Sequence, residues 1–232
     1  TTLRRGAPRG LMSITAWIVL LWIGFTGSHL GLASLRVEPK LRAKLGDAVF
    51  LGLYSAVALA LFIPLMSIYF SNRHAGPWLW VVPVGPALRA LLYLGMTIGI
   101  VLTVGSLIRP SPASIVPGGT AEVQGVYRVT RHPLVLGLAM VWALHLLPNA
   151  STADVAFFGG FLAFSLAGAW HQDVRKLAAG DATFRAFHAG TSFLPFGRGG
   201  LRGLIEIPPR VWALGVAATL GIRWLHGSIW PH

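Results

Sequence analysis

Long apolar runs separated by short charged segments are the dominant pattern along this chain. Residues 48–72 and 90–108, for example, contain no Asp, Glu, Lys or Arg. A helix needs about 20 mostly apolar residues to cross the hydrocarbon core of a bilayer. Reading the intervals between charges in this way predicts an all-α integral membrane bundle of about six transmembrane helices. Their expected bounds are 11–35, 48–71, 87–108, 133–148, 152–172 and 209–229.

The segments between these runs add detail to the predicted bundle, which we treat as a single membrane domain over residues 1–232. Pro64 is expected to kink the second helix. Residues 148–151 are a tight turn, so the fourth and fifth helices should form an antiparallel hairpin. Residues 174–188 are predicted to form one amphipathic segment on the cytoplasmic side, whose apolar face is available from Val174, Leu177, Phe184 and Phe187.

The distribution of Lys and Arg predicts the orientation. Most of these cations fall in residues 36–44, 109–131 and 175–210, which lie on one side of a six-helix bundle. The positive-inside rule makes that side cytoplasmic and puts the N-terminus outside. Arg4, Arg5 and Arg9 favour the opposite orientation.

Composition supports the membrane class and excludes several functions. The chain is 54% hydrophobic and 11% charged, and its formal net charge is +12. The cations are scattered between apolar runs, so they indicate a membrane edge and no nucleic-acid partner. The sequence contains no cysteine, which excludes disulfides, thiolate ligation of haem and thiol catalysis.

Histidines near the ends of predicted helices are the first candidates for chemistry. They are His29, His132, His145, His171 and His226. An ionisable side chain within a span is a functional hypothesis, and an interhelical hydrogen bond is the alternative. Two imidazoles from different helices suit a haem iron, whereas a structural zinc wants four ligands. His132 and His145 are about 20 Å apart along a helix, so they cannot ligate the same iron.

The tripeptide Arg131-His132-Pro133 indicates a helix start with affinity for anions. Proline suits the first helical position, and helix N-termini attract anions. Arg128 and Arg131 reinforce that attraction. The pattern predicts a carboxylate or phosphate site, and an ordinary positive-inside helix start is the alternative.

Four stretches resemble known families. Residues 125–137 resemble the Arg-His-Pro junction of NnrU-type proteins, 15-cis-zeta-carotene isomerases and isoprenylcysteine carboxyl methyltransferases. Residues 29–36, 168–173 and 191–196 resemble segments of the NnrU and isomerase families. Together these stretches are similar to the NnrU/zeta-carotene isomerase superfamily.

The resemblance implies a membrane haem b protein that isomerises the 15-cis bond of a carotene when its iron is reduced. Carried over by position, the iron ligands, which are also the catalytic residues, are His29 and His145, and Trp142 stands where the isomerase has a cysteine. In the six-helix topology these two histidines fall near opposite membrane faces, so His132 and His171 are the alternative partners of His29. Charge and depth suggest that haem propionates pair with Arg36, Arg128 and Arg131.

We therefore expect a multi-pass protein of a bacterial inner membrane, with the lipid bilayer and a hydrophobic polyene as its partners. Two other functions stay open. One is a non-catalytic haem subunit linked to denitrification or nitric oxide metabolism. The other is an S-adenosylmethionine-dependent methyltransferase, although Gln172-Asp173 replaces the acidic pair of that group.

Overall fold

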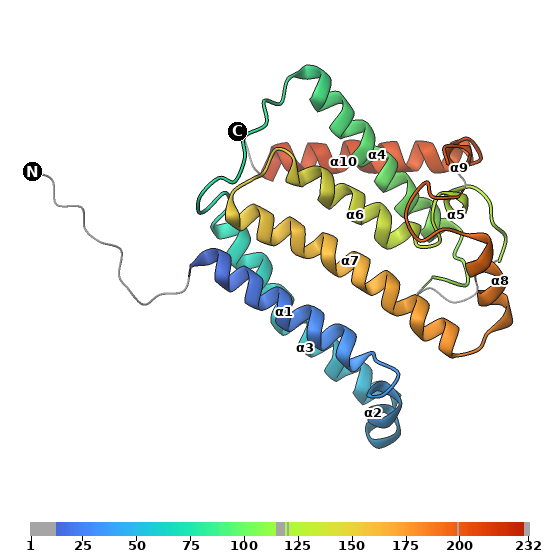
Figure 1. Cartoon of the computed structure of the whole chain (residues 1–232). Coiled ribbons are helices and arrows are strands. Elements are labelled where there is room, and N and C mark those ends of the chain that lie inside the picture. Colours follow the sequence, from blue (N-terminus) through green and yellow to red (C-terminus); the bar gives the residue numbers. More distant parts are fainter. Residues whose placement is uncertain (1–12, 115–118, 120, 199, 230–232) are drawn as a thin grey trace, which may run out of the picture. The chain divides into compact units, whose positions relative to one another are not determined.

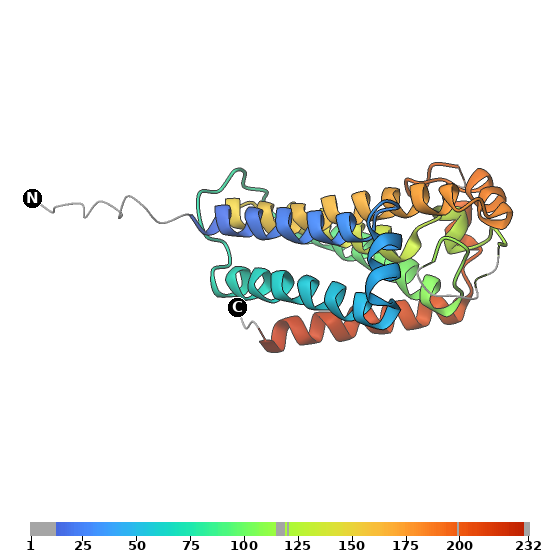
Figure 2. The ribbon, with the colours of Figure 1, turned by 90° about the horizontal axis from the view of Figure 1, so that it is seen from below.

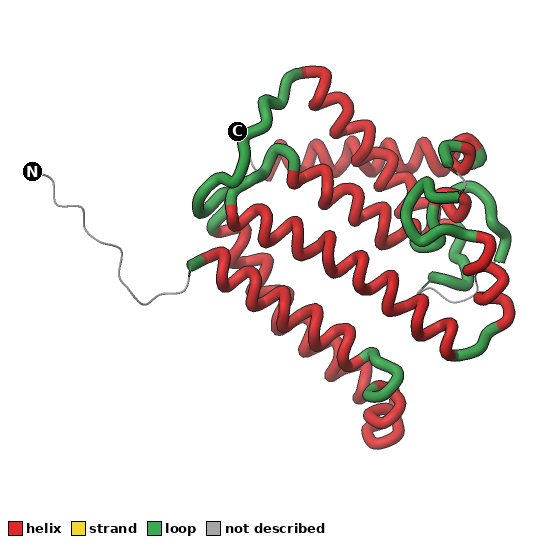
Figure 3. The backbone as a smooth tube through the Cα atoms, in the orientation of Figure 1, coloured by secondary structure: helices red, strands yellow, loops and turns green. Residues whose placement is uncertain are grey.

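The computed structural model describes residues 13–114, 119, 121–198 and 200–229. In this part of the chain every regular element is a helix and no strand is present (Figure 3). The helices are α1 Ile14–Leu32, α2 Glu38–Leu45, α3 Asp47–Ser71, α4 Pro86–Ile108, α5 Val126–Val129, α6 Pro133–Leu146, α7 Thr152–Ala178, α8 Ala182–Gly190, α9 Arg202–Ile205 and α10 Pro209–Ile229 (Figure 1). They belong to two compact units. The first comprises the residues up to Val81 and Asn149–Gly160, and the second comprises Val82–Pro148 and the residues from Phe161 onward.

All six predicted apolar segments are helices, and their bounds differ from the prediction by a few residues at most of their ends. Four of them, α1, α3, α4 and α7, are long and apolar enough to cross a membrane. Helix α6 has only 14 residues, and α10 does not reach the same apolarity within the described residues. The chain is therefore an all-helical membrane protein with four clear candidate spans. Residues 11–12 and Arg4, Arg5 and Arg9 lie outside the described residues.

The amphipathic segment predicted over residues 174–188 is wrong as a single helix. Helix α7 continues to Ala178 and stops before Gly180, whose φ of +79° favours glycine. Helix α8 then starts afresh, because the Asp181 side chain accepts a hydrogen bond from the Thr183 backbone N–H. The two parts also differ in burial: Phe184 and Phe187 are buried, whereas Val174 and Leu177 are exposed.

Helices α1 and α3 form the centre of the first unit, and the short helix α2 joins them (Figure 2). Trp22 of α1 is buried against Gly160, where an added Cβ would collide with the indole ring. Phe25 of α1 packs against Phe62 of α3, with ring centres 5.5 Å apart. Helix α1 thus packs a large side chain against a glycine of α7 and another against an aromatic ring of α3.

A buried carboxylate fixes the start of α7 within the first unit. Asp154 is fully buried, and its oxygens accept hydrogen bonds from the Tyr69 hydroxyl at 2.9 Å and from His74 Nδ1 at 2.9 Å. The backbone N–H of Ser151 also donates to this carboxylate at 3.3 Å. The loop after α3 is therefore tied to the first turn of α7.

In the second unit α4 and α6 cross at a pair of glycines. A Cβ built on Gly99 would lie 2.5 Å from the Gly137 carbonyl oxygen, and one on Gly137 would collide with the Gly99 carbonyl. Thr103 on α4 lies within hydrogen-bond distance of the Leu134 carbonyl, at 3.2 Å. Such close backbone contact is typical of small residues at membrane helix interfaces. It fixes α6, and with it the predicted Arg-His-Pro junction, against α4.

Replacing Gly137 by alanine should lower the free energy of unfolding by about 1–3 kcal/mol, because the helices must move apart to admit the new methyl group. The matched control is Gly168→Ala on α7. No atom lies within 4 Å of a Cβ built there, so this variant should be neutral or slightly stabilising. Unfolding in mixed detergent micelles measures both. Equal stability of the two variants would contradict the close crossing.

Candidate functional site

Three of the four stretches that carry the family resemblance meet within the second unit. The segment that follows α5 runs beside residues 191–196, where the Arg131 N–H donates to the Ser192 carbonyl and the Phe196 N–H donates to the Val129 carbonyl, both at 2.9 Å. The Thr130 hydroxyl donates to the Phe193 carbonyl at 2.6 Å. The third stretch is the end of α7, which brings Asp173 to the same place.

Asp173, Arg131 and His132 form a buried network. Arg131 Nε donates to one oxygen of the Asp173 carboxylate and His132 Nε2 donates to the other, each at 2.7 Å. The exposed fractions of the three residues are only 4%, 9% and 3% in that order. Because a carboxylate only accepts, Nε2 of His132 carries the proton. Arg131 also donates to the Thr191 carbonyl, at 3.3 Å.

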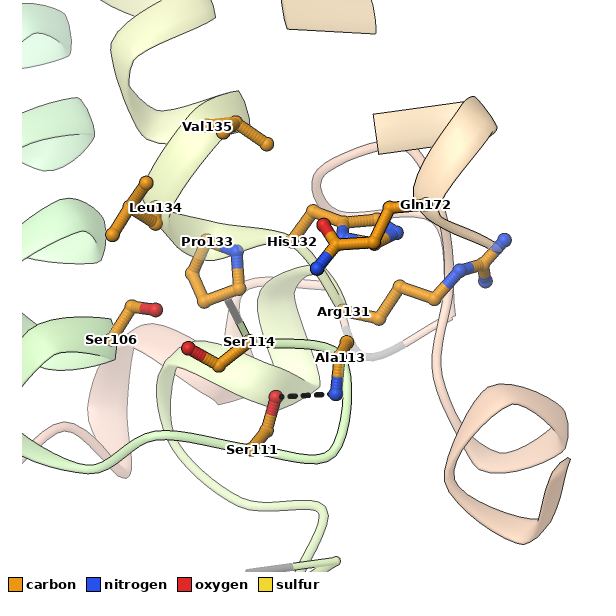
Figure 4. Close-up of a pocket in the computed structure, with 10 residues that line it drawn as sticks. All are labelled: Ser106, Ser111, Ala113, Ser114, Arg131, His132, Pro133, Leu134, Val135 and Gln172. Carbon is orange, nitrogen blue, oxygen red and sulfur yellow. Dashed lines mark hydrogen bonds between the residues drawn. The ribbon is translucent and has the colours of Figure 1, made fainter. Parts of the chain in front are cut away.

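A small cavity adjoins this network at the start of α6. Its volume is about 20 Å³, which is room for roughly one water molecule. Figure 4 shows Pro133 and three serine hydroxyls on one side of it and Gln172 on the other. The two ionisable side chains of the predicted anion site, Arg131 and His132, thus bind a carboxylate of the chain itself, that of Asp173.

The second predicted cation, Arg128, is also held by a carboxylate of the chain. Its Nε donates to Glu206 at 2.8 Å, and the backbone N–H of Gly125 donates to the same carboxylate at 3.1 Å. The guanidinium and this backbone group hold the pKa of Glu206 below its usual value. Arg36, the third cation predicted to pair with a propionate, lies in the first unit, where it is exposed between α1 and α2.

His188 lies beside the buried network, with Nε2 3.8 Å from an Asp173 oxygen. Burial lowers the pKa of His188 below the ordinary histidine value, and the positive charge of Arg131 adds to this effect against the attraction of Asp173. Protonation of His188 therefore favours the unfolded chain. The stability that the neutral imidazole contributes is fully present above the ordinary histidine pKa of about 6.5, and it is lost as the pH falls below that value.

We expect the imidazole of His188 in the folded protein to titrate below pH 6.5, at a value that proton chemical shifts measured in detergent micelles would give. Substituting Asp173 with asparagine should lower this pKa further, since the attraction of the carboxylate is lost while burial and the repulsion by Arg131 remain. A titration midpoint above that of a free histidine would show that the carboxylate dominates.

His29 lies in the last turn of α1, in the first unit, as the sequence predicts. Its ring stacks on Phe25 with centres 5.3 Å apart and lies 4.8 Å from the ring of Tyr54 on α3. The Tyr54 hydroxyl donates to the His29 carbonyl at 3.3 Å. The imidazole is thus held between aromatic rings of two apolar helices.

His145 occupies the last turn of α6 in the second unit. Its Nδ1 donates to the Val141 carbonyl at 2.8 Å, which fixes the tautomer with the proton on Nδ1 and makes Nε2 the unprotonated ring nitrogen. Trp142, which stands where the isomerase has a cysteine, stacks on Phe161 with ring centres 4.4 Å apart. His171 is partly buried on α7, two residues before Asp173.

The structure brings two further residues into these clusters: Asp173, which the sequence analysis gave no role in a site, and His226, which was one of the five candidate histidines but was paired with no other residue. The signal for Asp173 was its residue type, because an acidic residue at the end of an apolar helix is rare and indicates a function. His226 on α10 has its ring centre 6.4 Å from that of His145. The signal for this pair was topological: the fourth and sixth predicted spans run in the same direction, so their last turns lie at the same membrane face.

Comparison with known proteins gives a consistent result. A family model described as "NnrU protein" matches residues 17–231. The 15-cis-zeta-carotene isomerase of Zea mays is 28% identical over 182 residues, which cover 77% of this chain and 49% of that protein. The enzyme of the same name from Arabidopsis thaliana is 27% identical over 183 residues, with the same coverage. Both relatives are described as chloroplastic, and this chain spans about half of their length. No solved structure matches significantly.

Proposed function

Because this chain belongs to the NnrU family, we propose that it isomerises a cis double bond in a hydrophobic polyene of the 15-cis-zeta-carotene type. The observation that carries the proposal is its similarity to two such isomerases over 77% of its length. Its apolar helices suit a protein that takes a carotenoid directly from the bilayer. We place it in a bacterial inner membrane.

We further propose haem b as the cofactor, with His145 as an iron ligand. The support is the tautomer of this residue: Nδ1–H is held by the Val141 carbonyl, so Nε2 is the unprotonated ring nitrogen. Metal-bound imidazoles almost always donate their second ring N–H in this way. Without cysteine in the sequence, imidazole is the best iron ligand available. An imidazole in this tautomer is a donor that haem iron accepts.

Isomerisation adds and removes no atoms and leaves no net electron change, so the protein must only lower the barrier to rotation about one bond. A bound ferrous haem would supply electron density that reduces the order of the cis bond. The side chains around His145 would hold the polyene and exclude water. The stacked pair Trp142 and Phe161 provides an apolar wall there, with the Trp142 ring 6.1 Å from the imidazole.

The buried network argues against methyl transfer. S-adenosylmethionine is a cation, and a site for it needs a carboxylate that is free to face it. Asp173 stands at the position of the acidic pair, but Arg131 and His132 already hold both of its oxygens inside the protein. We therefore do not propose an S-adenosylmethionine-dependent reaction.

Two measurements test the proposed function. The purified protein should show a haem b band in its dithionite-reduced minus oxidised absorbance spectrum. A host that accumulates 15-cis-zeta-carotene should lose this isomer on expression of the chain, as followed by chromatography of its pigments. A haem band without conversion would favour the non-catalytic haem subunit. Absence of the band would contradict the haem proposal.

A further inference from the structure

A histidine paired with a buried carboxylate lies in the loop after α3, within the first unit. The Nδ1 of His74 donates to the Asp154 carboxylate at 2.9 Å. The Asp154 side chain is fully buried, whereas that of His74 is 49% exposed. In the neutral imidazole the proton on Nδ1 makes Nε2 the unprotonated nitrogen, which accepts hydrogen bonds. The buried anion therefore orients a half-exposed ring whose Nε2 can accept from a ligand.

The loop that carries His74 is held in one conformation by the start of α7. His74 has a φ of +60°, which is uncommon for a residue other than glycine. The Thr152 N–H donates to the Pro77 carbonyl at 2.9 Å, and the Ala153 N–H donates to the Ala75 carbonyl at 3.2 Å. Strained backbone of this kind is concentrated at functional sites. The imidazole is thus fixed before a ligand arrives, which lowers the entropy cost of binding.

A cavity of about 440 Å³ adjoins this loop. It is lined by the three residues that directly follow His74 and by residues at the starts of α1 and α7, including Ser13, Thr15 and Thr152. The Thr15 and Thr152 hydroxyls lie 2.9 Å apart, within hydrogen-bond distance. The volume is in the range of about 300–1,000 Å³ that is typical of small-molecule sites. The mixture of hydroxyls and apolar side chains suits a ligand with a few polar groups on an apolar frame.

The cavity lies where candidate membrane spans begin and end. Helices α1 and α7 start beside it, and the loop after α3 forms another wall. The ends of spans lie at the edge of the hydrocarbon core, so a ligand there can keep a polar head in the cavity and an apolar chain along the helices. None of the described residues that line the cavity is charged, so a phosphate headgroup would lose its hydration without compensation. A lipid with a neutral head is favoured.

An exposed indole beside His74 favours an aromatic head. The Trp78 ring is nearly parallel to the imidazole, with an interplanar angle of 20° and ring centres 5.9 Å apart. Trp78 is 50% exposed, so one of its surfaces is open to a ligand. Aromatic rings associate in offset-stacked or edge-to-face arrangements. The loop thus presents a hydrogen-bond acceptor and an aromatic surface side by side.

We propose that this site binds the head of a membrane quinol, an aromatic diol on an isoprenoid chain, and that His74 Nε2 accepts a hydrogen bond from one of its hydroxyls. The corresponding quinone has carbonyl oxygens in place of these hydroxyls and cannot donate to Nε2. The site therefore prefers the reduced form. The proposal does not depend on the proposed isomerisation, because binding of the quinol needs neither haem nor a carotenoid.

Calorimetric titration of the full chain in detergent micelles, with decylubiquinol kept reduced and with decylubiquinone, tests the proposal. The wild type should bind the quinol about 2- to 10-fold more tightly than the quinone, which is the effect of one hydrogen bond. His74→Asn keeps an N–H that can donate to Asp154 and lacks the acceptor at Nε2. It should lose the same factor in quinol affinity and should no longer distinguish the two forms.

A second variant tests the aromatic surface. Trp78→Leu should weaken binding of the quinol by about 2- to 10-fold, through loss of the ring contact. Trp17→Leu is the matched control, because it removes an indole of α1 that is 46% exposed and does not line the cavity. This control should bind the quinol as the wild type does. Unfolding of each variant in mixed detergent micelles distinguishes loss of a ligand contact from misfolding.

Three results would overturn the proposal. The first is a wild type that shows no saturable binding of the quinol. The second is equal affinity of the wild type for quinol and quinone. The third is a His74→Asn protein that is as stable as the wild type and binds the quinol equally well. If His74→Asn does not fold, Trp78→Leu decides, since it leaves His74 and Asp154 in place, and undiminished affinity of that variant would overturn the proposal.

Discussion

The Asp173→Asn variant is expected to lose about 3–5 kcal/mol of unfolding free energy, because removing one partner of a buried ion pair leaves the other charge without compensation. Arg131 is 9% exposed and donates to the Asp173 carboxylate at 2.7 Å, so water cannot replace the lost charge. Unfolding in mixed detergent micelles measures the change. The variant should also fold in lower yield.

An exposed pair in the same unit provides the control. Arg109 and Glu122 form an ion pair whose side chains are 45% and 63% exposed. Glu122→Gln should therefore cost no more than about 1 kcal/mol. Removing both buried charges, with Arg131→Met and Asp173→Leu together, should recover part of the loss. If Asp173→Asn cost as little as the surface variant, the buried network would not stabilise the fold.

The second large effect is expected for His145→Ala, which should abolish isomerisation of the polyene and most haem binding. Loss of an outer partner of a metal ligand already lowers affinity by about 10- to 100-fold, so loss of the ligand itself should lower it by at least about 100-fold. Haem content per protein, measured from the reduced absorbance band, and conversion of 15-cis-zeta-carotene in the expression host give the two readings.

His188→Ala is the control here, since the His188 ring lies 3.8 Å from Asp173 whereas His145 bonds to Val141 within α6. It should retain haem and conversion. A His145→Ala protein with full haem content would show that iron is held elsewhere. A variant that kept its haem and lost conversion would instead make His145 a residue that positions the substrate.

The helices could be predicted because charges bracket them. Asp47 and Arg73 enclose α3, and its observed bounds agree with the prediction to within one residue. The same rule failed at the end of α7, where the prediction stopped at residue 172 because Asp173 follows. The helix continues to Ala178, since Arg131 and His132 compensate the buried carboxylate. A local pattern does not contain that tertiary compensation.

The site was less predictable than the fold because its contacts join segments far apart in the sequence. The four resembling stretches were recognised one at a time, and nothing in their spacing indicates that three of them meet at Asp173. The pairing of His145 with His226 likewise depends on how α6 and α10 approach one another. The residue types indicate that these side chains can bind protons, carboxylates or metals, but they do not indicate which residues each side chain contacts in the fold.

The burial of Asp154 bears on the order in which the helices are inserted into the membrane. Its carboxylate is stable in an apolar setting only beside Tyr69 and His74. Both partners precede α7 in the chain, so a ribosome that feeds the helices into the bilayer in order delivers these hydrogen-bond donors before the carboxylate that accepts from them. A rearranged gene in which the α7 segment is translated before α3 would present an uncompensated anion to the insertion machinery, and such a chain should be degraded.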